Sequence, residues 1–107
     1  MRYRVITLCG STRFKEAFLK TQKHLTLEGN IVISVGFFSQ TDDIWNGMTE
    51  EEISEKLLML SDMHKQKIAM SDEIFVINVG GYIGESTLSE IEYAKSIGKE
   101  VRYLEKI

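Results

Sequence analysis

The sequence has no proline, one cysteine and two histidines among its 107 residues. The absence of proline favours compact elements joined without rigid spacers. Cys9 has no partner for an internal disulfide and lies in an apolar run, so we expect a small buried residue in a reducing compartment. His24 and His64 are forty positions apart, and no local spacing of metal ligands is present. We therefore expect neither a metal nor another cofactor.

Long apolar runs and an excess of positive charge are also missing. No segment approaches the roughly 20 apolar residues of a membrane span, and the first residues lack the apolar core of a signal peptide. The formal net charge of −3 argues against a protein that binds nucleic acid polymers through their phosphates. We expect a cytoplasmic protein that contacts neither membranes nor nucleic acid polymers, although a single nucleotide is a compatible ligand.

Apolar β-rich segments alternate with amphipathic helical patterns along the chain. The expected strands are 3–9, 31–35, 74–79 and 101–104, and the expected helices are 14–25, 50–70 and 87–97. Alternation with apolar strands implies a parallel sheet, right-handed crossovers and helices on both faces. We predict a single domain over residues 1–107. Its fold class is an α/β three-layer sandwich, flavodoxin-like or Rossmann-like, with about four strands in the order 2-1-3-4.

This strand order determines where a ligand should bind. The first and third strands are neighbours, and the helices that follow them leave toward opposite faces of the sheet. That arrangement opens a crevice between the two loops at the carboxyl ends of these strands. The loops hold residues 10–13 and 80–87.

Glu90 is a carboxylate on the apolar face of the last expected helix. At about 100° per residue, it projects with Ile91, Ala94 and Ile97. Burial of an acid raises its pKa and requires a partner, so Glu90 invites two interpretations. It either faces the crevice as a catalytic acid, or it completes a capping box by reaching back to the amide of Thr87.

The two loops carry groups suited to a polar ligand. Residues 10–13 read Gly-Ser-Thr-Arg between a strand and a helix, so backbone amides, two hydroxyls and a guanidinium could meet a phosphate or carboxylate. The alternative is that Ser11 or Thr12 caps the helix while Arg13 is solvated. The second loop is glycine-rich and ends in two hydroxyl residues. The candidate binding residues are Gly10, Ser11, Thr12, Arg13, Asn78, Gly80, Gly81, Tyr82, Gly84, Ser86 and Thr87.

Two aromatic residues are candidates for stacking on a flat base. Phe37 and Trp45 lie in the polar stretch 36–48, and aromatic faces accept any base. The alternative for each is an ordinary core position. Trp45 is the better candidate because its neighbours are polar.

The long middle helix carries a histidine within its apolar stripe. The stripe consists of Ile53, Leu57, Leu60 and Ile68. His64 is either a satisfied core or interface residue or part of the site. Leu58 and Met59 lie off the stripe, and this surplus of apolar surface indicates a partner helix, most simply in a homodimer.

The chain resembles the nucleoside 2-deoxyribosyltransferase-like superfamily, particularly its short uncharacterised bacterial and phage branch. The resemblance spans nearly the whole chain. It is carried by Gly-Ser-Thr-Arg at 10–13, Ser-Asp-Glu-Ile at 71–74 and Gly-Glu-Ser-Thr-Leu-Ser-Glu-Ile-Glu-Tyr-Ala-Lys-Ser-Ile-Gly-Lys at 84–99. It implies that Glu90 attacks the anomeric carbon of a nucleoside or nucleotide, that the first turn binds sugar or phosphate, and that the protein is a dimer or larger.

One position departs from the superfamily. His64 stands where members often have an aspartate that assists the leaving base, and Asp62 lies on another face of the helix. Either His64 replaces that acid as a proton donor, or the standard transfer reaction is lost. A histidine suits the work because its unperturbed pKa is about 6.5.

The resulting expectation is an N-glycosidic hydrolase or transferase with catalytic Glu90 and His64. A nucleoside or nucleoside 5′-monophosphate is the substrate, and a glycosyl ester of Glu90 is the intermediate. The helix start and nearby hydroxyls must offset the burial of Glu90. The alternatives are a nucleotide-binding module without turnover and a nucleotide hydrolase of the phosphoribohydrolase type, whose Gly-Gly-x-Gly-Thr-x-x-Glu signature residues 80–90 loosely match. A purely structural interaction protein is the third alternative.

Overall fold

The chain folds as an α/β sandwich built on one parallel sheet. The computed structural model describes residues 1–39 and 41–107. Its strands are β1 (Val5–Gly10), β2 (Ile31–Ile33), β3 (Glu73–Ile77) and β4 (Glu100–Tyr103). Its helices are α1 (Lys15–Leu27), α2 (Glu50–Ala69) and α3 (Glu85–Ser96), with 3₁₀ turns at Thr12–Phe14 and Val79–Gly81. The strand order is β2-β1-β3-β4 with parallel pairing throughout, so the predicted fold class is confirmed.

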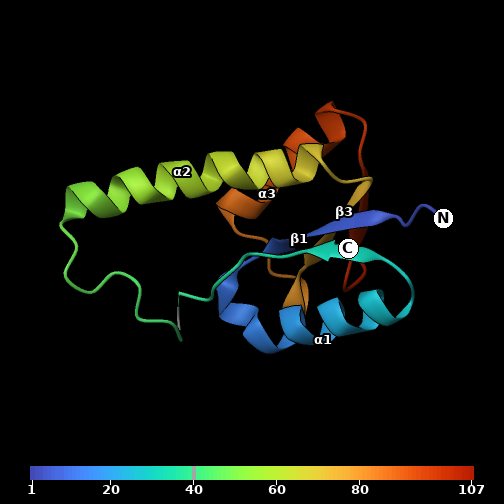
Figure 1. Ribbon diagram of the computed structural model, residues 1–107, viewed down its shortest axis with the longest axis horizontal. Coiled ribbons are helices and arrows are strands. Elements are labelled where there is room, and N and C mark those ends of the chain that lie inside the picture. The colour runs from blue at the N-terminus through green and yellow to red at the C-terminus, as the bar shows by residue number, and fades with distance from the viewer. Residues whose placement is uncertain (40) are drawn as a thin grey trace.

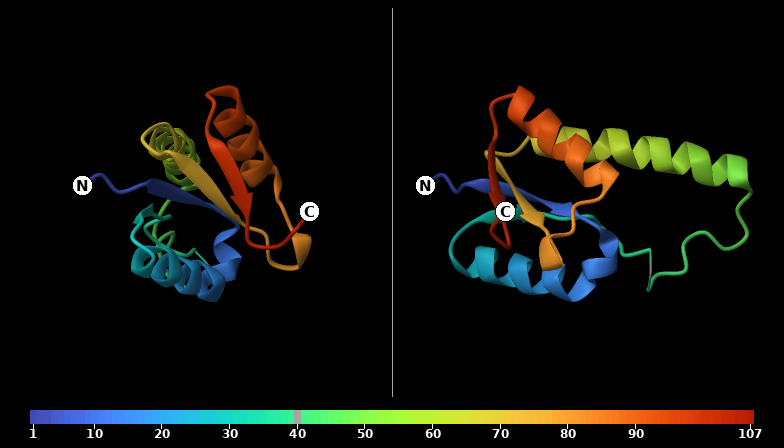
Figure 2. Two further views of the ribbon diagram at one scale, coloured as in Figure 1. Left: turned by 90° about the vertical axis from the view of Figure 1, so that its right-hand side faces the viewer. Right: turned by 180° about the vertical axis from the view of Figure 1, so that it is seen from behind.

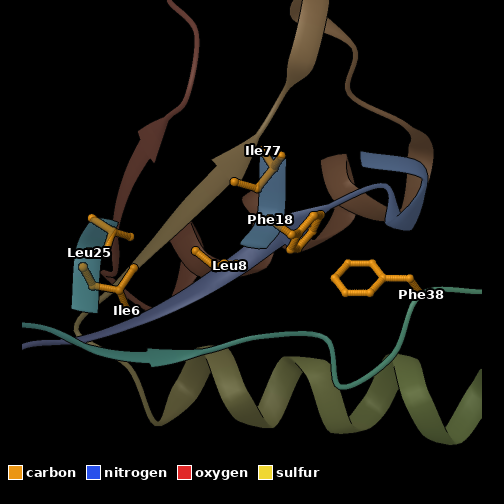
Figure 3. Close-up of a cluster of buried hydrophobic side chains, with 6 residues drawn as sticks. All are labelled: Ile6, Leu8, Phe18, Leu25, Phe38 and Ile77. Atoms are coloured by element: carbon orange, nitrogen blue, oxygen red, sulfur yellow. The ribbon is translucent and has the colours of Figure 1, made fainter. Parts of the chain in front are cut away.

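The helices cover both faces of the sheet (Figure 1). Helix α1 lies on one face, and α2 and α3 lie together on the other, as the side views of Figure 2 also show. Side chains alternate along each strand. Hence Ile6 and Leu8 of β1 pack with Phe18 of α1 (Figure 3), whereas Cys9 packs toward Ile68 of α2. The predicted departure of α1 and α3 toward opposite faces is confirmed.

Strands β1 and β3 leave no room for a side chain on Gly10, where β1 ends. Gly10 pairs with Ile77, and a Cβ atom at Gly10 would lie 2.8 Å from the carbonyl oxygen of Ile77. Only glycine fits this approach. The close contact sets the separation of the two loops that follow these strands.

Helix α2 begins at a complete capping box. The Thr49 hydroxyl accepts from the Glu52 amide, and the Glu52 carboxylate accepts from the Thr49 amide, each at 3.1 Å. The helix then runs past the edge of the sheet (Figures 1 and 2), and its amino-terminal half projects from the body. Only His64 and Ile68 are buried on it, so the predicted apolar stripe is covered at one end alone.

The sequence predicts no membrane-spanning segment, and the helices bear on this prediction. In the part of the chain that the structure describes, no helix combines the length and the apolar character needed to cross a membrane.

Candidate active site

A cavity of about 580 Å³ opens where β1 and β3 end, between the loops after these strands and helices α2 and α3. It therefore lies at the crevice that the strand order predicts. The predicted site residues that line it are Gly10, Ser11, Thr12, Phe37, Trp45, His64, Tyr82, Gly84, Ser86, Thr87 and Glu90. Its volume is in the range of small-molecule sites.

Glu90 projects from α3 toward a histidine and a cysteine that come from two other elements. Its Oε1 lies 3.8 Å from His64 Nε2, and the two side chains are 18% and 10% exposed. The same Nε2 lies 3.4 Å from the Sγ of buried Cys9. The capping-box interpretation of Glu90 is wrong, because α3 begins at Glu85 with Gly84 as its N-cap.

Burial dominates the electrostatics of this cluster. Desolvation raises the pKa of Glu90 from its ordinary 4.5 to about 7, although a hydrogen bond with the Cys9 thiol and the charges of Lys65 and Lys67 lower it. The pKa of Glu90 therefore stays raised, so the expected compensation for its burial is incomplete. The compensation comes from Cys9, Lys65 and Lys67 rather than from the helix start. At pH 7 the carboxyl and carboxylate forms of Glu90 are both well populated.

His64 and Cys9 are uncharged at neutral pH. Burial lowers the pKa of His64 to about 4, helped by the charge of Lys67 and opposed by a hydrogen bond to the Leu8 backbone. Burial likewise raises the pKa of the Cys9 thiol well above its ordinary value. The approach of His64 to Glu90 is thus a contact of a neutral imidazole with a carboxyl group, not an ion pair.

A second buried acid shows what a structural carboxylate looks like in this protein. Glu73, at the start of β3, is 2% exposed. It accepts from the guanidinium groups of Arg4 and Arg102, each through Nε at 2.5 Å. Glu90 has no guanidinium partner among the described ion pairs. The contrast favours a chemical role for Glu90, because a buried acid without a strong counter-charge is costly to keep.

The turn after β1 contains the cap that the sequence left open as one interpretation, and two of its residues line the cavity. Ser11 caps the 3₁₀ turn, accepting from the Arg13 amide at 3.3 Å and from Arg13 Nε at 3.1 Å. Thr12 Oγ1 lies 3.1 Å from Ser39 Oγ. Both hydroxyl residues also line the cavity. Arg13 does not line it, and its guanidinium instead stacks on the Tyr82 ring at 4.4 Å.

Asn78, Gly80 and Gly81 lie outside the cavity lining. The side-chain amide of Asn78 donates through Nδ2 to the backbone oxygen of Glu105 at 2.9 Å. Its Oδ1 accepts from the backbone amide of Glu105 at 2.8 Å. The Gly80 amide donates to the Glu105 carboxylate at 2.8 Å. These contacts tie the start of the loop to the segment after β4, which gives Asn78 and Gly80 a structural use.

The aromatic candidates line the cavity from two different loops. The Phe37 and Trp45 rings meet edge to face with centroids 6.5 Å apart. The Tyr82 ring lines the cavity from the loop after β3 and is 42% exposed. Aromatic surface for a flat ligand is therefore present in the cavity lining.

Sequence reasoning missed two members of the site, Cys9 and Lys67. Cys9 was expected to be buried, and it is, but its contact with His64 joins elements 55 positions apart. Lys67 lines the cavity and donates to the Ser34 carbonyl oxygen at 2.8 Å. The sequence does point to Lys67, because it follows the candidate His64 by three residues and residues three apart are neighbours on a helix surface.

Comparison of the chain with models of protein families and with curated proteins found no match. The site's own groups define what it can do. A carboxyl group with a pKa of about 7 can exchange a proton or attack an electrophile near neutral pH, and the hydroxyls and aromatic rings around it can orient a polar, flat ligand.

Proposed function

We propose that this protein cleaves the N-glycosidic bond of a nucleoside or nucleoside 5′-monophosphate, by hydrolysis or transfer, with Glu90 as nucleophile. The observation that supports it most is Glu90 itself: a buried carboxyl group without a guanidinium partner among the described ion pairs, lining a cavity of about 580 Å³. Hydroxyl residues and aromatic rings line the same cavity, as recognition of a sugar and a base requires.

The proposed reaction is a double displacement. A carboxylate oxygen of Glu90 bonds to the anomeric carbon while the bond from that carbon to the base nitrogen breaks, and its electron pair leaves with the base. Water or a second base then attacks the same carbon and releases Glu90. The transition state has oxocarbenium character, so groups that hold the sugar rigidly accelerate both steps.

The leaving base needs a proton, and His64 is the proposed donor. Its pKa of about 4 leaves it neutral in the free protein at pH 7. A bound 5′-phosphate would bring negative charge and raise that pKa. This consideration favours nucleoside 5′-monophosphates over nucleosides as substrates.

The remaining predicted residues have positioning roles in this proposal. The turn at Gly10, Ser11 and Thr12 holds the sugar or its phosphate with backbone amides and hydroxyls. Ser86 and Thr87, in the first turn of α3, contact it from the other side. Phe37, Trp45 and Tyr82 stack on the base, and Arg13 acts through Tyr82.

The proposed setting is a cytoplasmic homodimer. Helix α2 exposes an apolar surface at Leu57, Leu58, Met59 and Met63, which are 52%, 72%, 43% and 44% exposed. Leu57 and Met63 also line the cavity. A second copy packed on this helix would cover apolar surface beside the mouth of the site.

The test is release of free base from a panel of nucleosides and 5′-monophosphates, ribo and deoxy, measured by chromatography. Glu90→Gln keeps the shape of the side chain but removes the nucleophile, so the rate should fall by more than about 10³-fold. Glu92→Gln is the matched control, because Glu92 is an exposed acid on the same helix, and it should retain the wild-type rate. Full activity in Glu90→Gln would refute the assignment.

A nucleotide-binding module without turnover is the second candidate. It is favoured by the neutral state of His64, which leaves the free protein without a charged proton donor beside Glu90. It predicts that a nucleotide raises the melting temperature, because a ligand of the native state stabilises it, while no base appears on long incubation. Release from 5′-monophosphates alone would instead favour a nucleotide hydrolase.

A further inference from the structure

Three side chains of different chemical type converge at the wall of the cavity. Cys9 is the residue before the last of β1, His64 lies on α2 and Glu90 lies on α3. Their Sγ, Nε2 and carboxylate oxygen atoms all lie within 4.8 Å of one another. No local spacing in the sequence reveals this group, because each member comes from a different element.

Two of the separations are close to the edges of a tetrahedral metal site. Zinc binds thiolate at about 2.3 Å and imidazole or carboxylate at about 2.0 to 2.1 Å. At tetrahedral angles these bond lengths place sulfur and nitrogen about 3.6 Å apart, and nitrogen and oxygen about 3.3 Å apart. The observed separations are 3.4 Å from Cys9 Sγ to His64 Nε2 and 3.8 Å from that nitrogen to Glu90 Oε1. These two separations lie within about half an ångström of the tetrahedral values, and the third, from Cys9 Sγ to a Glu90 carboxylate oxygen, is no longer than 4.8 Å.

The surroundings of the three ligands suit a metal ion with one open position. A hydrogen bond to the Leu8 backbone holds the His64 ring, and such outer contacts orient metal-binding histidines. His64 and Glu90 line the cavity, whereas Cys9 is fully buried behind them. An ion would therefore enter from the cavity side and keep its fourth position toward solvent.

We propose that Cys9, His64 and Glu90 form a binding site for a zinc-class divalent cation. A thiolate, an imidazole and a carboxylate together favour zinc over the harder magnesium and calcium ions. On binding, the Cys9 S–H bond breaks and sulfur bonds to the metal, and a carboxyl oxygen of Glu90 that carries a proton loses it as that oxygen bonds to the metal, so that both protons leave to water. The thiolate and the carboxylate together balance the charge of the ion.

Lys67 is the group that opposes this site. Its charge acts on both Cys9 and Glu90, and it would repel a cation. Its ammonium group is held by the Ser34 carbonyl oxygen at 2.8 Å, which keeps it directed to the backbone. The proposed site is thus compatible with Lys67 in its observed position.

The site goes beyond the proposed function and competes with it. A carboxylate that holds a metal ion is not free to attack a sugar carbon, so zinc should block base release. Metal binding itself does not depend on that reaction. It can therefore be measured on the protein alone, without any nucleoside.

The experiment is a titration of the metal-free protein with Co²⁺, followed by displacement with Zn²⁺. Cobalt bound to a thiolate gives a charge-transfer band in the near ultraviolet, and tetrahedral cobalt gives visible bands. We expect both bands to saturate at one ion per chain and to disappear when Zn²⁺ is added. Cys9→Ser should lose the charge-transfer band. Glu90→Gln should keep that band but require at least about tenfold more cobalt, since a ligand is lost.

The control is His24→Gln. His24 and Glu28 form a surface pair with 3.3 Å between Nε2 and the carboxylate, and surface pairs of this kind can also attract cobalt. The variant should titrate as the wild type does. The proposal is overturned if the wild type shows no charge-transfer band, if Cys9→Ser retains it, or if His24→Gln removes it. Should Cys9→Ser fail to fold, an unchanged cobalt affinity in Glu90→Gln would overturn the proposal by itself.

Discussion

At the scale of single residues, the ionisation of Glu90 should control activity. Burial raises its pKa to about 7, and only the carboxylate can act as a nucleophile. Hence, for a nucleoside whose base leaves without a proton from His64, kcat/KM should be low below pH 7, rise as pH passes through 7, and level off above it, because this profile reports the ionisation of Glu90 in the free enzyme. The measurement is base release against pH in the presence of EDTA.

A variant of Cys9 checks the cause of this profile. The thiol hydrogen bond lowers the pKa of Glu90, so Cys9→Ala should move the midpoint of the rise to higher pH. A midpoint that does not move would show that the thiol has no influence on the carboxyl group. A profile that falls as pH rises through 7 would make Glu90 a proton donor rather than a nucleophile.

At the scale of elements, the end of β1 is the glycine position where an added Cβ meets the shortest contact. In Gly10→Ala, the new methyl group would lie 2.8 Å from the Ile77 carbonyl oxygen and 3.1 Å from the Ile77 Cβ. The strands must separate, so the free energy of unfolding should fall by about 1–3 kcal/mol, and base release should fall because both site loops shift. Urea denaturation measures the first effect.

Gly36→Ala is the control for the glycine prediction. Gly36 also has a positive φ, +84°, but its Cβ position has no neighbour within 4 Å. It therefore isolates the backbone strain, and its loss of stability should be smaller than that of Gly10→Ala. An equal loss in both variants would mean that close strand contact at Gly10 is unimportant.

The elements themselves were largely predictable from the sequence. Apolar strands and helical periodicity gave the sheet order 2-1-3-4, and this order alone brings the loops after β1 and β3 together. The start of α3 was misplaced at Thr87 because the actual N-cap, Gly84, makes no side-chain hydrogen bond. Capping patterns rest on side-chain acceptors, so a glycine cap leaves a weaker signal.

The site was predictable only where one element determines the position. Glu90 and His64 each stood out as polar residues on an apolar helix face, and both line the cavity. The contact of Cys9 with His64 and the hydrogen bond from Asn78 to the Glu105 backbone depend on packing between distant segments. Periodicity within one segment carries no information about such contacts.

At the scale of the whole molecule, the exposed apolar surface of α2 should determine the oligomeric state. Leu58 is 72% exposed and does not line the cavity, so Leu58→Asp removes apolar surface without entering the site. Burial of a leucine is worth about 1.5–3 kcal/mol, and a symmetric dimer buries it twice. The dimer should therefore weaken by about 100-fold or more. Light scattering after size-exclusion chromatography measures the mass over a concentration series.

Leu27→Asp is the matched control for this prediction. Leu27 is 77% exposed at the end of α1, on the opposite face of the sheet from α2 (Figure 1). Its variant should remain dimeric, because the proposed contact does not include α1. If Leu27→Asp dissociates and Leu58→Asp does not, the dimer forms through the other face of the sheet. A wild-type chain that stays monomeric at every concentration would contradict the dimer altogether, and the exposed surface of α2 would then have to be covered by a different partner.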